Sequence, residues 1–352
     1  MNPILSEFYS KQQKRIQLER LLLKEYNMEM PKIKYCPGKL TEGFETYSPI
    51  VLRKMFNGKK ISPMLFYPSP SDSKERSVFN ENQLHISISG FQEKYSLIIE
   101  NSKLRLTNED ECGQYILKPI SDLPKNSEFA PANEHLTMQI AQQIFKIETA
   151  ENALIFFQDG KPAYITKRFD VNKNGEKLAV EDFASLLQKS PATHGEQYKY
   201  KGNYLELFET LKKYVPATKV EAPKLFKLIL FNYLFSNGDA HLKNFSLKET
   251  EQGDFKLSPA YDLLNTKIHI ADADFALNEG LLPKSISKGK IKDQFFLLSQ
   301  KAEIPEKTTA KIFKNITSHE KEVIELTNRS FLTEQLKRNF IQSYQAKLKK
   351  LG

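Results

Sequence analysis

Strand-like segments fill the first part of the chain and helical patterns fill the rest, and this order limits the folds that the chain can adopt. One segment among the strands, Asn133–Phe145, has apolar residues at helical spacing. Asp159-Gly160 separates the last two strands and predicts a hairpin. The predicted strands, which are rich in β-branched and aromatic residues, are Lys94–Glu100, Leu104–Thr107, Gln114–Lys118, Ala153–Phe157 and Ala163–Phe169.

Beyond Asp170 the pattern changes to helices. Gly253 stands between two further strand-like segments, which predicts a second hairpin. A sheet-rich part followed by a helical part indicates an α+β protein. The predicted helices are Val180–Gln188, Tyr204–Tyr214, Ala222–Phe235 and most of Asp293–Leu351, and the second hairpin pairs Asn244–Lys248 with Phe255–Ser258.

The chain before the first strand has a different character. Residues 1–30 read as a charged helix, and Pro49–Phe56 reads as a short one. The Pro/Ser-rich run Ser62–Ser73 is typical of a flexible connector. We therefore expect three segments: an N-terminal helical and connector segment (1–80), a small sheet-rich domain (81–170) and a larger helical domain (171–352).

Composition indicates a globular protein with a basic surface. The 352 residues are 40% hydrophobic and 27% charged, and the formal net charge is +9. This excess suits an anionic ligand, but the basic residues are scattered and form no DNA-binding pattern. No apolar run is long enough to span a membrane, no signal pattern opens the chain, and Cys36 and Cys112 are too few for a disulfide framework. We expect a cytoplasmic protein.

The segment Asn237–Asn244 carries the strongest chemical signal. Asp239 and Asn244 stand five positions apart after an apolar helix, and Asp262 follows downstream. Phosphoryl transfer from ATP uses such a set: one carboxylate orients the acceptor hydroxyl, and an amide and a second carboxylate hold magnesium. Alone, Asp-x-x-x-x-Asn occurs often by chance, and Asn-Gly-Asp is more typical of a surface turn. The apolar neighbours of Asp262 predict a partly buried carboxylate, which needs a partner such as a metal or a helix start to cap.

Two segments of the sheet-rich part are candidates for binding the phosphates of ATP. Lys118 closes an apolar strand, and Glu134 on the following helix is the expected charge partner that holds it. A lysine at a strand end is more often simply exposed. Ser87–Lys94 is a strand–turn–strand element around Gly90 whose backbone N–H groups could approach phosphate, although the segment would also pass for a hairpin.

Two basic side chains lie within the Asn237–Asn244 segment. His241 could fix the loop through a local hydrogen bond, and Lys243 could neutralise the transferred phosphoryl group. The domain order and these oxygen ligands together favour a protein-kinase-like bilobal fold, with a small β-rich N-lobe and a larger helical C-lobe.

Six segments of the chain together carry a resemblance to a known family. In chain order they are Ser87–Lys94, Tyr115–Pro119, Asn133-Glu134, Lys167–Asp170, Asn237–Asn244 and Pro259–Leu264. With these segments the chain resembles the HipA family of bacterial serine/threonine kinase toxins. The resemblance covers roughly residues 80–330 and is most like the short HipT type, because of the Ser87–Gly90 loop, the truncated N-terminal region and the insertion at Gly195–Tyr198.

The resemblance implies an ATP- and Mg²⁺-dependent protein kinase that phosphorylates a translation component, typically an aminoacyl-tRNA synthetase. It implies a HipB-like DNA-binding antitoxin as partner and, for the HipT type, a small HipS-like protein. Asp239 would be the catalytic residue, with Asn244 and Asp262 as magnesium ligands. The implied nucleotide-binding residues are Ser89, Gly90, Phe91, Gln92, Glu93, Lys94, Lys118, Lys167, Arg168, Phe169, His241, Leu242, Lys243, Asn244 and Asp262.

The family autophosphorylates a serine in the phosphate loop, which here corresponds to Ser87, with Ser89 as a second acceptor. A phosphate adds a charge of about −1.5 to −2 beside the place of the ATP phosphates, so it should expel the loop and stop activity. The N-terminal domain of long HipA proteins has no counterpart here, and the helical pattern of residues 1–30 is not part of the family pattern.

Two other functions fit parts of the sequence. A small-molecule phosphotransferase shares the Asp-x-x-x-x-Asn arrangement, and a catalytically silent scaffold that binds an antitoxin needs none of it. The Ser87–Gly90 loop and Asn133-Glu134 favour the protein kinase over the first, and the complete set of catalytic positions favours it over the second.

Overall fold

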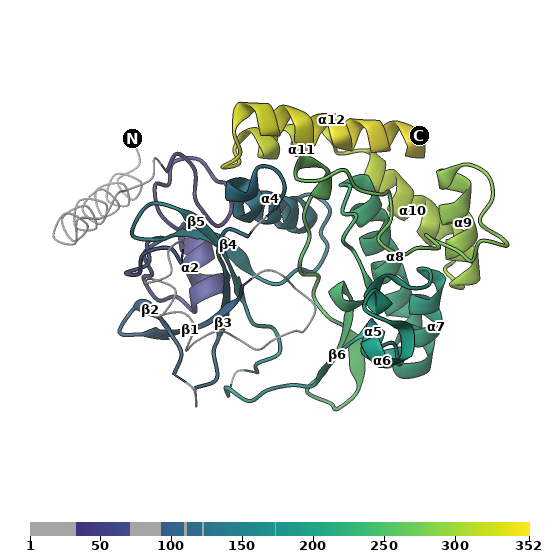
Figure 1. Ribbon diagram of the computed structural model, residues 1–352, viewed down its shortest axis with the longest axis horizontal. Coiled ribbons are helices and arrows are strands. Elements are labelled where there is room, and N and C mark those ends of the chain that lie inside the picture. Colours follow the sequence, from purple (N-terminus) through teal and green to yellow (C-terminus); the bar gives the residue numbers. More distant parts are fainter. Residues whose placement is uncertain (1–32, 71–92, 109–110, 122, 173) are drawn as a thin grey trace. The chain divides into compact units, whose positions relative to one another are not determined.

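The computed structural model describes residues 33–70, 93–108, 111–121, 123–172 and 174–352. The chain divides into two units (Figure 1). The sheet unit holds the described residues up to 121 together with Glu128–Ala132 and Glu151–Lys167, and the helical unit holds the remainder. The residues 1–32 and 71–92 lie outside the described part, so the predicted helix over 1–30 and the strand–turn at Ser87–Gly90 do too.

The sheet unit is built on a five-stranded antiparallel sheet, as the alternation predicts. The strand order is β2-β1-β3-β5-β4. The turn at Asp159-Gly160 joins β4 to β5, with Phe156 opposite Pro162, so the predicted hairpin is confirmed. The strands are β1 (Tyr95–Glu100), β2 (Lys103–Leu106), β3 (Tyr115–Lys118), β4 (Asn152–Phe156) and β5 (Pro162–Lys167).

The predicted helix at Pro49–Phe56 is helix α2, and it forms part of the core of the sheet unit. Phe56 is fully buried, with ring centroids 5.0 Å from Tyr47 and 5.7 Å from Tyr115. The Tyr115 hydroxyl donates to the carbonyl of Met55 at 2.9 Å, so the strand β3 and the helix are joined by a buried hydrogen bond as well. The apolar face of α2 therefore covers the sheet.

The expectation of a flexible connector is wrong for Ser62–Pro70. This segment runs beside β4: Leu65 N donates to the Phe156 carbonyl and Phe156 N donates to the Pro63 carbonyl, each at 2.8 Å. Met64 and Leu65 are buried. The reason is that apolar side chains stand between the Pro and Ser residues of the run, and burying them outweighs the flexibility that composition suggests.

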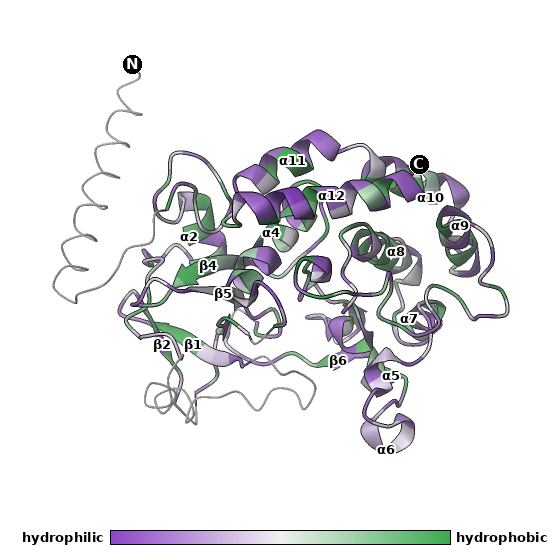
Figure 2. Cartoon of the chain, turned by 45° about the horizontal axis from the view of Figure 1, so that its top comes forward, coloured by the Kyte–Doolittle hydropathy of each residue, from purple (hydrophilic) through white to green (hydrophobic). Residues whose placement is uncertain are grey.

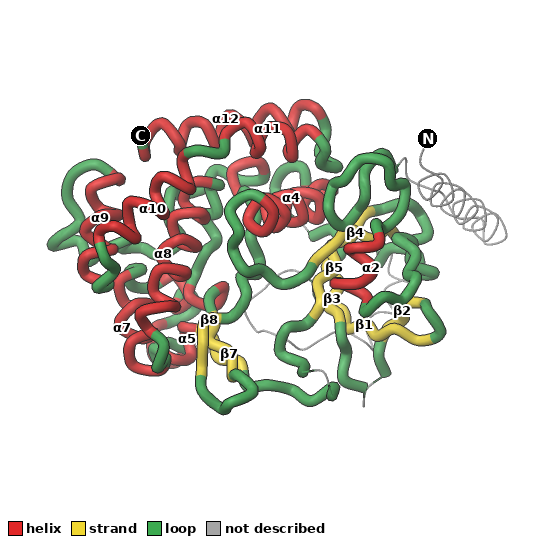
Figure 3. Tube along the Cα trace, turned by 180° about the vertical axis from the view of Figure 1, so that it is seen from behind, coloured by secondary structure: helices red, strands yellow, loops and turns green. Residues whose placement is uncertain are grey.

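Eight helices and a small three-stranded sheet are found among the described residues of the helical unit, in addition to most of helix α4 (Ala130–Gln143) (Figure 3). The sheet has the order β6-β7-β8, and β7 and β8 form the predicted second hairpin. The elements are β6 (Val180–Asp182), α5 (Phe183–Leu186), α6 (Pro191–His194), α7 (Leu205–Tyr214), α8 (Thr218–Leu234), β7 (Ser246–Glu249), β8 (Phe255–Leu257), α9 (Ile291–Lys301), α10 (Glu306–Thr317), α11 (Glu320–Asn328) and α12 (Glu334–Leu351), with short 3₁₀ turns between them.

One predicted helix in this unit is wrong. The segment Val180–Gln188 is divided into the strand β6 and the short helix α5. Asp182 begins the helix, because its carboxylate accepts a hydrogen bond from Ser185 N at 2.9 Å. The residues before it pair with β7, with Glu181 opposite Leu247. That pairing depends on a strand far along the chain, which local periodicity does not report.

Helix α8 is the centre of the helical unit. It is buried on nearly all sides, and Figure 2 shows it largely in the colour of hydrophobic residues. Phe145, which follows α4, packs edge-on against Phe231 and Phe235 near the end of α8, with centroid distances of 5.6 and 5.7 Å. The end of α8 is therefore fixed, and the loop that follows starts from a rigid element. Within the described ranges, no helix is long and apolar enough to cross a membrane.

Candidate functional site

The segment 237–244, here named the Asp239 loop, begins at a sharp turn after α8. Ser236 adopts a left-handed backbone conformation with φ of 54°. Thr266 holds the turn, because its hydroxyl donates to the Ser236 carbonyl at 2.9 Å and accepts from Gly238 N at 3.0 Å. A Cβ atom at Gly238 would come within 2.2 Å of an Asp272 carboxylate oxygen. The Asp272 side chain thus packs directly on the Gly238 backbone, and a larger residue at this position would have to displace it.

The carboxylate of Asp239 projects from this loop and is partly open to solvent. Its side chain is 45% exposed, and Oδ1 accepts a hydrogen bond from the Tyr200 hydroxyl at 2.7 Å. Loss of surrounding water raises the pKa of Asp239, and the carboxylates of Asp262 and Asp272 raise it further. The hydrogen bond from Tyr200 and the ammonium group of Lys199 act in the opposite direction. This carboxylate can hold or accept a proton beside two other acids.

Asn244 lies on the same loop and is oriented by Asp239. Its side-chain nitrogen donates to the Asp239 backbone carbonyl at 2.8 Å. Because the nitrogen makes this bond, the amide oxygen is the atom that remains for a metal ion. The Tyr204 hydroxyl donates to the Ala240 carbonyl at 2.7 Å and so holds the middle of the loop.

Asp262 is brought to the Asp239 loop by a second asparagine. Asn237 Nδ2 donates to the Asp262 carbonyl at 3.4 Å and to Asn232 Oδ1 at 3.0 Å. The Asp262 side chain is partly buried, as its apolar neighbours predict. Its φ of 54° places it in the left-handed region, which costs about 1–3 kcal/mol for a residue other than glycine. Strain of this kind persists where the surrounding structure fixes the backbone, and it is frequent at functional sites.

The chain after Asp262 is tied to helix α4 through the fully buried Asn133. Asn133 Nδ2 donates to the Asn265 carbonyl at 2.9 Å, and Asn265 N donates back to Asn133 Oδ1 at 3.1 Å. Before Asp262, Ala260 N donates to the Glu148 carbonyl at 2.8 Å. Hydrogen bonds on both sides therefore fix the position of Asp262.

The donor set suits magnesium. It offers the amide oxygen of Asn244 and the carboxylate of Asp262, and hard oxygen ligands are those that magnesium prefers. The side-chain oxygen of Asn237 is buried beside Asp262 without a hydrogen-bond partner among the described residues. No group of three or more His, Cys, Asp or Glu side chains with a metal-binding arrangement occurs in the part of the chain that the structure describes. The site would thus depend on the amide of Asn244 as a ligand.

The basic residues of the Asp239 loop have other partners in this structure. The ring of His241 is buried edge-on against Tyr200, with a centroid distance of 5.1 Å, and burial lowers the pKa of His241 to about 3. The imidazole is therefore neutral at physiological pH. Lys243 Nζ lies 3.9 Å from the Asp182 carboxylate. Leu242 is buried, so its side chain belongs to the core.

The implied nucleotide-binding residues Lys167, Arg168 and Phe169 make separate contacts. The guanidinium of Arg168 makes a bidentate pair with Asp170. The ring of Phe169 lies 5.7 Å from that of Tyr261, which immediately precedes Asp262. Lys167 belongs to the sheet unit, where its ammonium donates to Asn57 Oδ1 at 2.6 Å. Of these three residues, Phe169 is thus the one whose ring contacts the residue before Asp262.

The phosphate-binding candidates of the sheet unit are described only in part. Lys118 is 3% exposed, and its ammonium lies 5.3 Å from the centre of the Tyr164 ring. Glu93 accepts a hydrogen bond from the Tyr95 hydroxyl at 2.7 Å, and Lys94 is partly buried. The serines 87 and 89 and residues 90–92 lie outside the described residues. Glu134 is buried in the helical unit, and its pairing with Lys118 remains a prediction.

Three residues reach the site through contacts that the sequence does not predict. Tyr200, Asp272 and Asn133 lie far from the Asp239 loop along the chain and meet it or its neighbours only in the fold. A buried asparagine on an apolar helix is a sign that Asn133 has a specific partner. Nothing comparable marks Tyr200 or Asp272.

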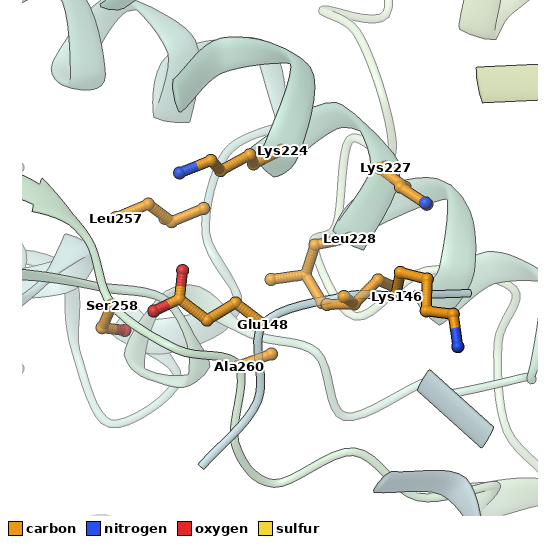
Figure 4. A pocket seen from close by; sticks show the side chains of 9 residues that line it. Lys146, Glu148, Lys224, Lys227, Leu228, Leu257, Ser258 and Ala260 are labelled. Atoms are coloured by element: carbon orange, nitrogen blue, oxygen red, sulfur yellow. The ribbon is translucent and has the colours of Figure 1, made fainter. Parts of the chain in front are cut away.

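A pocket of about 230 Å³ lies elsewhere in the helical unit (Figure 4). None of the predicted catalytic or metal-binding residues lines it. Several of its charges are already paired: Lys224 with Glu221 at 2.7 Å, and Glu148 with Lys256 at 3.6 Å. It is lined by Lys146, Ile147, Glu148, Lys224, Lys227, Leu228, Leu257, Ser258 and Ala260. The pocket is therefore distinct from the Asp239 site.

Comparison with known proteins places the chain in a family. A Haemophilus influenzae protein named as an inferred kinase is 29% identical over 244 residues, which cover 68% of each chain. The inferred kinase Y4dM of Sinorhizobium fredii is 31% identical over 255 residues, which cover 68% of this chain and 59% of that protein.

Among solved structures, the HipA chain of Shewanella oneidensis, determined with HipB and its operator DNA, matches the fold. The TM-score is 0.56 at 19% identity, over 76% of this chain and 64% of that chain. The chain thus spans less than two thirds of the HipA and Y4dM lengths. Residues 86–324, which include Asp239, Asn244 and Asp262, match the family model of the HipA-like C-terminal domain. The chain belongs to the family of HipA-like C-terminal domains.

Proposed function

We propose that this protein is an ATP- and Mg²⁺-dependent serine/threonine protein kinase and acts in the cytoplasm as a HipA-like toxin, most like the HipT type. One observation carries the proposal: the helical unit brings together Asp239, Asn244 and Asp262, which come from two loops separated in sequence. The relatives named as inferred kinases support the reaction class.

In this mechanism the residues of the Asp239 loop orient the substrate hydroxyl that receives the phosphate. Asp239 would accept a hydrogen bond from the substrate hydroxyl, align its oxygen for attack on the γ-phosphorus and take its proton as the new oxygen–phosphorus bond forms. The bond from the γ-phosphorus to the bridging oxygen would break, and ADP would leave. The hydrogen bonds from His241 N (2.7 Å) and Asn244 Nδ2 (2.8 Å) to the Asp239 backbone carbonyl keep the backbone that carries this carboxylate in place. A loop fixed in advance loses little entropy at the moment of reaction.

Asn244 and Asp262 would hold the metal ion through their side-chain oxygens. The ion would supply positive charge to the phosphate oxygens of ATP. The strained backbone of Asp262 and its anchors, Asn133 and Asn237, keep the two ligands at a fixed separation. Burial raises the pKa of Asp239, and the neighbouring carboxylates of Asp262 and Asp272 raise it further.

The rest of the nucleotide site is proposed from the sequence. Lys118 and the loop Ser89–Lys94 would contact the phosphates, and Lys167–Phe169 would contact the adenine, with Phe169 packed on Tyr261. Glu134 would hold Lys118. Autophosphorylation of Ser87 or Ser89 would place negative charge in this loop and switch the kinase off.

The proposed partners follow from the relatives. A HipB-like DNA-binding antitoxin is proposed because the solved HipA was determined with HipB and operator DNA. A small HipS-like protein is a further proposed partner, as in the HipT type. The proposed substrate is an aminoacyl-tRNA synthetase or another translation component.

The proposal is tested by phosphate transfer from labelled ATP to proteins and small molecules of a bacterial lysate. We expect labelled proteins with the wild type, and Asp239→Asn should lower transfer by at least about 100-fold because it removes the base and keeps the shape. Peptide mass spectra of the same samples should show phosphate at Ser87 or Ser89. Label only in small molecules would favour a small-molecule phosphotransferase. No turnover of ATP by the wild type would favour a silent scaffold.

A further inference from the structure

We propose that Tyr200 is a positioning residue for Asp239, which binds one carboxylate oxygen and leaves the other to the substrate hydroxyl. This inference rests on the proposed function, in which Asp239 receives the acceptor. Tyr200 stands in a short 3₁₀ turn (Tyr198–Tyr200) and is 39 positions from Asp239 in sequence. No sequence motif connects the two.

The geometry assigns different roles to the two oxygens of Asp239. Oδ1 accepts from the Tyr200 hydroxyl at 2.7 Å, whereas His241 Nε2 is 3.8 Å away, beyond hydrogen-bonding distance. Within the described residues, Oδ2 has no hydrogen-bond donor. Because the side chain is 45% exposed, this second oxygen is the one that an incoming hydroxyl can reach.

Tyr200 is held firmly enough to act as an orienting group. Its carbonyl accepts from Asn278 N at 2.9 Å, and its own N–H bonds to the Gln197 carbonyl at 3.0 Å. Two residues on, Gly202 N donates to Asn278 Oδ1 at 2.9 Å. The Tyr200 ring packs edge-on against His241 at 5.1 Å. Backbone bonds and ring contact therefore fix the hydroxyl independently of the bond to Asp239.

A phenol suits this position because it donates a hydrogen bond without competing for the proton. Burial and the nearby carboxylates of Asp239 and Asp272 raise the pKa of Tyr200, so its hydroxyl stays protonated at neutral pH. A bond from a neutral donor to a charged acceptor is stronger than one between neutral groups. Removing it should let the Asp239 carboxylate rotate between orientations, only some of which face the substrate.

The test compares Tyr200→Phe with Tyr198→Phe, a matched control on the same 3₁₀ turn whose hydroxyl has no partner among the described residues. We expect Tyr200→Phe to lower kcat for phosphate transfer by about 10- to 100-fold with little change in the KM for ATP, and Tyr198→Phe to leave both unchanged. An unchanged or increased kcat for Tyr200→Phe would overturn the proposal, since the hydroxyl would then be dispensable or would block the acceptor. Phosphate on Tyr200 in peptide spectra would also overturn it, because the hydroxyl would then be an acceptor.

A second control separates positioning from support of the fold. Tyr204→Phe removes the bond to the Ala240 carbonyl on the same loop but leaves the Asp239 carboxylate untouched. We expect Tyr204→Phe to lower the melting temperature more than Tyr200→Phe does, and to lower kcat less than Tyr200→Phe does. If the two variants change both quantities alike, Tyr200 is a structural residue and the proposal fails.

Crystal structures of the wild type and Tyr200→Phe give a readout that needs no kinase activity. We expect the Asp239 carboxylate to rotate or to adopt two orientations in the variant. A carboxylate that keeps its wild-type orientation would overturn the positioning role. If the wild type transfers no phosphate, the proposed function fails, and the orientation of Asp239 still decides whether Tyr200 positions it.

Discussion

The core of the sheet unit and the Asp239 loop of the helical unit are each stabilised by a different kind of interaction. Around Phe56 the contacts are apolar and shared among many rings and aliphatic side chains, so no single pair decides the arrangement. In the Asp239 loop the contacts are single hydrogen bonds between particular side chains and backbone groups, such as Asn244 to the Asp239 carbonyl and Thr266 to the Ser236 carbonyl.

The difference determines what a substitution does. Apolar burial is roughly proportional to area, so a change in the sheet core alters stability in proportion to the volume that is lost. A hydrogen bond in the loop fixes a direction, so its loss displaces a functional group even where the free energy of unfolding changes little. We therefore expect stability effects in one region and activity effects in the other.

The largest effect is expected from Asp262→Asn. Asparagine tolerates the left-handed backbone, so the variant removes the charge without adding strain. ATP binding in the presence of Mg²⁺ should weaken at least about tenfold, and phosphate transfer should fall about 100-fold or more. Calorimetric titration with and without Mg²⁺ measures the first. The control is Asp254→Asn, in the exposed β7–β8 turn, which should bind as the wild type does. If Asp262→Asn bound ATP with wild-type affinity in the presence of Mg²⁺, Asp262 would not be a metal ligand.

Phe56→Ala is the matching change in the sheet core. The loss of a fully buried ring should lower the free energy of unfolding by about 3–5 kcal/mol, measured by urea denaturation. At low temperature the folded fraction should keep most of its activity. The control Ile50→Ala, on the same helix but 44% exposed, should change stability by less than about 0.5 kcal/mol. A large loss of activity per folded molecule in Phe56→Ala would contradict the separation of the two regions.

Asn133→Ala tests whether the buried hydrogen bonds between Asn133 and Asn265, which tether the Asp262 segment to helix α4, affect both stability and activity. It leaves the Asn265 N–H and carbonyl without their partner, which should cost about 1–3 kcal/mol of stability. The amides that follow Asp262 should exchange hydrogen faster, and kcat should fall, because the loop that carries Asp262 loosens. Protection of these amides at the wild-type level would show that the tether does not hold the loop.

The smallest effect concerns Lys347, whose ammonium is nearly buried, 2.5 Å from the Asp274 carboxylate and 4.1 Å from the centre of the Tyr233 ring. Burial lowers the pKa of Lys347 to about 8. An unfolded lysine keeps its proton to about pH 10.4, so between pH 8 and that value the unfolded chain binds more protons and stability rises with pH. Relative to that of Lys347→Met, the free energy of unfolding of the wild type should rise by on the order of 1 kcal/mol across this pH range. A constant difference between the two proteins would show that burial does not penalise the charged lysine.

Local pattern predicted most of the elements, because periodicity and turn residues act over a few positions. The helix Pro49–Phe56 and the hairpin at Asp159-Gly160 are as expected. The errors lie where a distant partner decides the structure. Val180–Asp182 is a strand because β7 pairs with it, and Ser62–Pro70 is ordered because its apolar residues pack beside β4.

The same distinction applies to the site. Asp239 and Asn244 lie on one loop, so their spacing alone predicts that they are neighbours. Tyr200 and Asn133 reach the site from 39 positions before Asp239 and 132 positions before Asn265, and no short pattern encodes such contacts. The sequence therefore predicts neighbours within one loop better than it predicts contacts between residues far apart in the chain.

The most direct test of the central claim is a crystal structure of the wild type with Mg²⁺ and a non-hydrolysable ATP analogue. We expect a metal ion in contact with the side-chain oxygens of Asn244 and Asp262, and a terminal phosphate that faces the carboxylate of Asp239. A nucleotide bound elsewhere, for example in the pocket lined by Lys224 and Glu148, or a metal ion that contacts neither Asn244 nor Asp262, would contradict it.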